Sequence, residues 1–166
     1  MEHLSRFLCV VLCVLSSSVK ATPWGMPGEA VIRSSNAGLL ICMPKEALNH
    51  IKVDSIGVYE KSSRGGKRQP MWEIELKQND SPVQIKLGGC VIYGSVPLGY
   101  QERVAPKSWT VGGTYYARIN LVVVSPVRRS TLFYDAVFCV GQQFDGLFIY
   151  RQYVYGGDGS TIKATC

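Results

Sequence analysis

Histidine, the side chain that most often serves in acid-base catalysis and in metal binding, is scarce in this chain. The 166 residues contain two histidines, His3 and His50. A histidine-based catalytic triad outside the first few residues would have to use His50, which has no serine or cysteine motif of a known nucleophile beside it. We therefore interpret His50 as a surface or loop residue.

Closely spaced cysteine pairs are missing as well. The last four cysteines are separated by 48, 49 and 27 residues, whereas structural zinc sites use short spacings such as C-x-x-C. The glycine pairs of the sequence are not followed by a helix that could hold a phosphate. The sequence thus predicts no metal and no cofactor.

One pair of carboxylates has a spacing that catalysis could use. Glu73 and Glu75 point to the same side of a predicted strand, about 7 Å apart, a separation that some glycoside hydrolases use. Any amphipathic strand produces this spacing, and we expect both acids to be fully exposed. We therefore expect no enzymatic activity.

Apolar runs long enough to cross a membrane, about 20 residues, are absent from the sequence. The longest run, 7–15, follows Arg6 and precedes small polar residues that end at Ala21. This is the layout of a secretory signal peptide. We expect 1–21 to be removed and 22–166 to form one exported, periplasmic domain without a membrane anchor. Cys13 raises lipid attachment as an alternative, but Leu12 stands where that motif needs a small residue.

Removal of this segment leaves 16 basic and 11 acidic residues, a net charge of +5, and four cysteines. An even number of cysteines in an exported chain predicts two disulfides, with three possible pairings among which the sequence does not choose. The four residues are Cys42, Cys90, Cys139 and Cys166.

The positive charge is spread along the chain rather than gathered in a binding stripe. Only one stretch is locally basic and is interrupted by glycines; it contains Lys61, Arg64, Lys67 and Arg68. We interpret it as a solvated hairpin loop, with an electropositive contact for an acidic partner as the alternative. The distribution argues against nucleic acid as a ligand.

Hydrophobic residues alternate with a period of two along most of the domain. The pattern predicts strands over 51–60, 72–77, 83–87, 115–124, 132–140 and 147–155, with a reversal of the alternation at Ser55 and Ile56. Glycine and proline turns separate these runs. We predict an all-β, immunoglobulin- or fibronectin-like sandwich of seven to eight antiparallel strands with disulfides, a loose leader over 22–28 and at most a helical turn over 45–50.

Tyr115 follows Trp109, a glycine turn and Thr114 at the start of an alternating strand. Immunoglobulin-like and fibronectin-like domains place a tyrosine at such a strand corner, where its hydroxyl bonds back to the backbone. We predict this role for Tyr115, with an ordinary buried tyrosine as the alternative.

The order of several segments resembles a known family. The matching pieces are Leu40-Ile41-Cys42, Trp72-Glu73-Ile74, the run from Cys90 to Tyr100, Gly112-Gly113-Thr114-Tyr115 and Ala136-Val137-Phe138-Cys139. They resemble small bacterial periplasmic proteins, often lipoproteins, that are described as immunity proteins of type VI secretion systems. The resemblance covers about 39–140, and its most specific part is C-x-x-Y-G-x-x-P-x-G-Y.

Two departures from this family are visible. The chain has no lipid-attachment cysteine, which implies a soluble periplasmic form, and it extends beyond Cys139 to Cys166. The resemblance implies a protein without catalytic residues that binds a toxin delivered by a neighbouring cell and blocks its active site. A general secreted enzyme inhibitor and an adhesion or pilus-type subunit are the alternatives, although 22–28 lacks the alternating extension of a donated strand.

Binding by occlusion requires exposed anchor residues on a rigid scaffold. The sequence places our candidates in the segment from Tyr93 to Tyr100, where Pro97 stands between glycines. Tyr93, Pro97 and Tyr100 would contact the partner. The alternative is a structural turn whose glycines and proline determine its shape.

Overall fold

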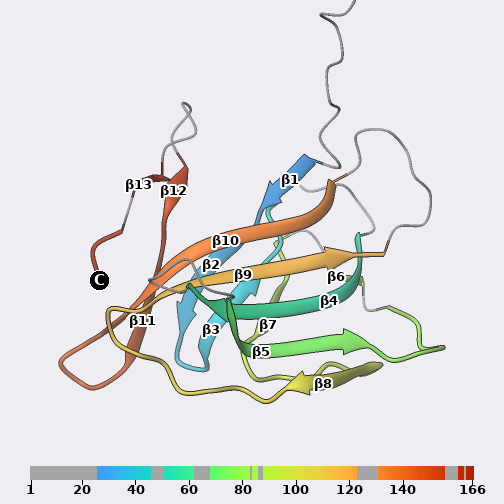
Figure 1. Ribbon diagram of the computed structural model, residues 1–166, viewed down its shortest axis with the longest axis horizontal. Helices are drawn as coiled ribbons and strands as arrows, with labels where there is room; N and C mark the ends of the chain where they lie inside the picture. Colours follow the sequence, from blue (N-terminus) through green and yellow to red (C-terminus); the bar gives the residue numbers. More distant parts are fainter. Residues whose placement is uncertain are drawn as a thin grey trace, which may run out of the picture.

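The computed structural model is an all-β domain in which two sheets pack face to face (Figure 1). It describes residues 26–45, 51–61, 68–82, 84–85, 88–122, 131–155, 161–162 and 164–166. The predicted signal peptide, His50, Arg64 and Lys67 lie outside these residues. Within the described ranges, no helix is long and apolar enough to cross a membrane. The all-β, sandwich-like prediction is confirmed.

The larger sheet has eight strands, six of which form a continuous path. In spatial order these are β1 (Met26–Glu29), β10 (Thr131–Gln142), β9 (Thr114–Leu121), β4 (Ile51–Glu60), β5 (Gln69–Leu76) and β8 (Tyr100–Val104). Two short strands lie outside this path. β11 (Phe148–Gln152) pairs with the end of β10, and β6 (Gln84–Ile85) pairs with the start of β4. All pairings are antiparallel except β1 with β10.

The smaller sheet lies behind β9 and β10 in Figure 1. It consists of β2 (Val31–Ser35), β3 (Gly38–Cys42) and β7 (Cys90–Ile92). A separate two-stranded piece, β12 (Val154–Tyr155) with β13 (Thr161–Ile162), follows β11 near the C-terminus.

Strand alternation produces the core, because every second residue of the larger sheet faces the smaller one. Trp72, Val58, Ala117 and Ala136 lie opposite one another across four neighbouring strands, and all are fully buried. The predicted reversal in β4 is confirmed: the pairing with β9 shifts between Val53 and Ser55, so that Val53 and Ile56 are both buried.

Several predicted boundaries were wrong. Residues 26–28, predicted as part of a loose leader over 22–28, belong to β1, which pairs in parallel with β10. The strand β8 was not predicted, because its middle residues Gln101, Glu102 and Arg103 are polar and exposed and show no alternation. Of the predicted strand 83–87, the described residues form only β6.

Polar side chains join the two sheets at one edge. Gln152 of β11 accepts a hydrogen bond from the Ile32 backbone N–H (2.7 Å) and donates to the Ala30 carbonyl (2.8 Å). The Ser34 hydroxyl accepts the backbone N–H of Tyr150 (2.8 Å). Because these bonds run from β11 to β2 and to Ala30 just before β2, they close this side of the sandwich.

Two disulfides are present, as predicted. Cys42 and Cys90 are directly opposite residues of β3 and β7, and their bond crosses the smaller sheet. Cys139 of β10 is bonded to Cys166, which attaches the C-terminus to the larger sheet.

We predict that peptide mapping without reduction will recover the pairs Cys42–Cys90 and Cys139–Cys166 and no alkylated thiol. Replacing both cysteines of a pair by alanine should lower the free energy of unfolding by about 4 kcal/mol for the first pair and about 3.5 kcal/mol for the second, because the larger loop restricts the unfolded chain more. Denaturant unfolding measures this difference. Two free thiols in the untreated protein would contradict the assignment.

Candidate functional site

The segment from Tyr93 to Tyr100 is held to the domain from within. The Tyr93 hydroxyl accepts the backbone N–H of Lys107 (2.9 Å) and lies 3.0 Å from the Met71 carbonyl. Its ring packs between Trp72 and Trp109, with centroid distances of 5.4 and 4.4 Å. Tyr93 therefore joins this segment to the neighbouring chain rather than presenting its ring to solvent.

Tyr100 is buried more completely, with 3% of its surface exposed, and its hydroxyl donates to the Val53 carbonyl. Pro97 is partly buried and its carbonyl accepts the Tyr100 N–H (3.1 Å). The burial of Tyr100 rules it out as an exposed anchor, which corrects its predicted binding role. Tyr93 is partly buried, and its hydroxyl and ring are already used within the domain. This geometry favours the alternative of a structural turn. The exposed apolar side chains here are Val96 and Leu98.

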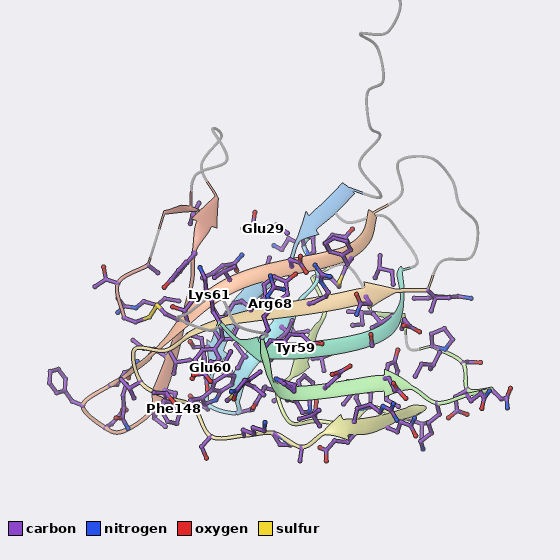
Figure 2. All side chains as sticks on the ribbon, viewed as in Figure 1. Glu29, Tyr59, Glu60, Lys61, Arg68 and Phe148 are labelled. Atoms are coloured by element: carbon purple, nitrogen blue, oxygen red, sulfur yellow. A yellow bond between two sulfur atoms is a disulfide. The ribbon has the colours of Figure 1, made fainter. Side chains whose placement is uncertain are left out.

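The basic stretch connects β4 to β5, which pair in antiparallel fashion with Glu60 opposite Gln69; residues 62–67, and with them most of the predicted hairpin loop, lie outside the described residues. Of its four basic residues, the structure describes Lys61 and Arg68. The Arg68 guanidinium lies 4.0 Å from the centre of the Tyr116 ring on the outer face of the larger sheet. Figure 2 shows Arg68 and Tyr59 on this face.

The same outer face carries an ordered polar network. Arg118 forms two 2.8 Å hydrogen bonds with Asp135, and its guanidinium lies 4.0 Å from the centre of the Phe133 ring. The paired carboxylate raises the pKa of Arg118. Since each of these groups already has a partner within the chain, we assign the network to stability.

Glu73 and Glu75 lie on this face and are partly buried, not fully exposed as expected. Glu75 accepts a hydrogen bond from Gln101 (2.7 Å) and forms an ion pair with Arg103 (3.1 Å). These two contacts attach β8, whose middle residues are polar and exposed, to the neighbouring strand β5.

A different surface gathers exposed apolar side chains. Three turns, at 36–37, 110–113 and 143–147, lie at the same end of the sandwich (Figure 1). The backbone N–H of Gly112 donates to Val140 (2.8 Å), which places the second turn beside the end of β10. We call this region the loop end. Its exposed apolar residues are Val111, Phe144, Leu147 and Phe148.

Phe144 occupies a corner of the turn between β10 and β11, and its side chain is fully exposed, at 115% of the reference surface. The turn is closed by hydrogen bonds from Gly146 N–H to Gln143 (3.0 Å) and from Gln143 N–H to Leu147 (2.8 Å). Gly146 has a φ of 85°, which glycine adopts without strain. The Asp145 carboxylate accepts the Leu147 N–H (3.0 Å), so the turn has one well-defined shape.

Aromatic side chains pack together next to the turns of the loop end. The Trp109 ring lies 4.8 Å from Tyr115, 6.0 Å from Phe138 and 5.5 Å from Tyr150, measured between centroids. The Tyr115 hydroxyl accepts the backbone N–H of Thr110 (2.9 Å), which is the backward bond predicted for this tyrosine. The turns are therefore attached to a rigid base.

A groove of about 410 Å³ separates the turn at 36–37 from β11. Its lining residues share one property: none carries a charge. They are Ser34, Ser35, Asn36, Ala37, Gly38, Gln143, Leu147, Phe148, Ile149 and Tyr150.

Sequence reasoning missed this surface, although one signal was present. Asp145-Gly146 between two alternating runs is a strong hairpin signal. We predicted a strand over 147–155 after this turn but assigned no role to the turn itself. The informative feature was Phe144, an aromatic residue at a turn corner where polar residues are usual.

In the part of the chain that the structure describes, no three histidine, cysteine or acidic residues are grouped as metal ligands. Comparison of the chain with protein-family models, curated proteins and solved structures found no match.

The buried tyrosines predict a loss of stability at alkaline pH. Burial raises the pKa of Tyr93 from 10 to about 12, and that of Tyr116 likewise to about 12. The folded protein holds these protons more tightly than the unfolded chain, so their contribution is complete below pH 10 and is lost as the pH rises through 12. Denaturant unfolding should show this decline, and Tyr93→Phe should make it shallower. An unchanged slope in the variant would contradict the assignment.

Proposed function

We propose that this chain is an exported, non-catalytic binding protein that presents the hairpin between β10 and β11 to a protein partner. The observation that carries the proposal is the full exposure of Phe144 at the corner of a turn whose backbone is fixed by hydrogen bonds. Leu147 and Phe148 extend the apolar surface behind it, and Figure 2 shows Phe148 at the hairpin.

Aromatic residues dominate the energy of protein interfaces because they bury a large area at a small cost in side-chain entropy. A preformed turn lowers that cost further, since little backbone freedom is lost on binding. Polar side chains surround Phe144: the Gln142 amide donates to the Gly146 carbonyl (3.0 Å), and Gln143 and Asp145 are exposed. An apolar centre with a polar rim is the usual composition of a protein interface.

We further propose that the partner is a toxin and that binding blocks it, as in type VI secretion immunity. The resemblance of its motifs to that family motivates this choice, and the two disulfides fit an extracellular or periplasmic location. A projecting aromatic residue is suited to entering the cleft of an enzyme. A general inhibitor of secreted enzymes would use the same surface; a toxin gene next to this gene would favour immunity, and a gene without such a neighbour would favour the inhibitor.

Phe144→Ala should weaken binding to the toxin encoded by a neighbouring gene by about 2 kcal/mol, which is about 30-fold in Kd. Its melting temperature should stay unchanged, because the side chain has no packing to lose. Isothermal titration calorimetry and thermal unfolding provide the two values.

Leu98→Ala is the matched control. Leu98 is 95% exposed and also sits at a turn corner, before Gly99 with a φ of 87°, but Gly99 bonds to Lys77 beyond the far end of β5. This control should bind normally. If Leu98→Ala weakens binding and Phe144→Ala does not, the interface lies at the opposite end of the sandwich.

A further inference from the structure

The hairpin between β10 and β11 extends beyond the strands that support it. Pairing of β10 with β9 ends at Cys139, whereas its pairing with β11 continues to Gln142. The turn at 110–113 bonds to β10 as far as Val140 (2.8 Å). Among the described residues, every hydrogen bond of 142–149 lies within the hairpin itself. Because a two-stranded ribbon alone is marginally stable, a fixed shape of this hairpin needs a further contact.

The segment 164–166 supplies that contact, at the level where the pairing with β9 ends. Cys166 is bonded to Cys139 of β10, and the Arg151 guanidinium of β11 donates a hydrogen bond to the Thr165 carbonyl (2.6 Å). Cys139 and Arg151 are directly opposite residues of the two strands. The end of the chain is therefore attached to both strands of the hairpin at one level (Figure 1).

A glycine of β10 leaves room for this arrangement. Gly141 is opposite Ile149, and a Cβ atom at position 141 would lie 3.1 Å from Ile149 Cγ1 and 3.9 Å from Cys166 Cα. The Ile149 side chain thus lies over Gly141, with Cys166 beside it. Ile149 also lines a hollow of about 520 Å³ together with Phe144 and Arg151. The contacts made by the end of the chain are therefore continuous with the surface that carries Phe144.

We propose that Thr165 and Cys166 are positioning residues for toxin binding. Attached to Arg151 and Cys139, they keep the hairpin in the shape that presents Phe144. This inference rests on the proposed function, because it concerns the same hairpin and the same partner. An ordered hairpin loses little conformational freedom on binding. Without these attachments only a fraction of the molecules would present Phe144, and the apparent Kd would rise in inverse proportion to that fraction.

The second disulfide of the protein provides a matched control. Cys42 and Cys90 are opposite residues of β3 and β7, so their bond lies within the smaller sheet. Its loss should lower the free energy of unfolding at least as much as the loss of Cys139–Cys166, because it closes the larger loop. If the disulfides act on binding only through overall stability, the two losses should affect toxin binding alike. The positioning role predicts an effect of one of them alone.

Isothermal titration calorimetry with the toxin encoded by a neighbouring gene tests the proposal, at a temperature where all variants are folded. Cys139→Ala/Cys166→Ala should bind about 10-fold more weakly than the wild type. Cys42→Ala/Cys90→Ala should bind as the wild type does. Hydrogen–deuterium exchange of the free proteins gives an independent readout: exchange at 142–148 should become faster in the first variant and not in the second.

Phe144→Ala in the Cys139→Ala/Cys166→Ala background shows whether the segment acts through the hairpin anchor. An ordered hairpin brings little benefit once its anchor is missing, so loss of the disulfide should then cost clearly less than about 10-fold in Kd. Fully additive losses would show that the segment 164–166 contacts the toxin itself, and would overturn the positioning role.

Two further results would overturn it: equal weakening of binding by the loss of either disulfide, and unchanged exchange at 142–148 in Cys139→Ala/Cys166→Ala. If Phe144→Ala weakens binding while Cys139→Ala/Cys166→Ala binds as the wild type does, the proposed function stands and the positioning role does not. If Phe144→Ala binds normally, the proposed function fails and the positioning role fails with it, whatever the exchange at 142–148.

Discussion

The packing of Trp109 against four other aromatic rings is the contact on which the loop end depends. Its ring touches Tyr93 after β7, Tyr115 of β9, Phe138 of β10 and Tyr150 of β11. Three of these rings come from strands of the larger sheet, Tyr93 comes from the turn that follows β7 of the smaller sheet, and Trp109 itself lies in the segment between β8 and β9. Because one side chain joins so many elements, the turns above it share a single rigid support, and the position of the hairpin follows from core packing.

The two faces and two ends of the larger sheet have different roles. Its inner face packs on the smaller sheet, and its outer face consists of paired groups such as Arg118 with Asp135 and Arg68 with Tyr116. Satisfied charges of this kind stabilise a sheet that would otherwise expose apolar surface. The loop end is different, because Phe144 has no such packing within the described residues. The candidate site is therefore the place where an exposed apolar ring lacks packing, and not the outer face, where the side chains named above have partners.

Much of the fold could be predicted from sequence, because burial on one face produces a period of two. The alternation located β4, β9 and β10, and even the bulge after Val53 was visible as a reversal. Parallel pairing of β1 and the polar edge strand β8 could not be predicted, since both depend on contacts with distant strands. The site was misplaced for a related reason: tyrosines between glycines look like exposed anchors, and only the fold shows that Tyr100 points inward.

We propose that the loop end is the surface that meets the partner. Hydrogen–deuterium exchange with and without the toxin encoded beside this gene tests that claim directly, because it reports on the backbone amides of the whole chain. Toxin binding should slow exchange in the three turns at 36–37, 110–113 and 143–147, and leave β8 and the outer face unchanged. Protection confined to β8, or to the outer face around Tyr59 and Arg68, would contradict the account.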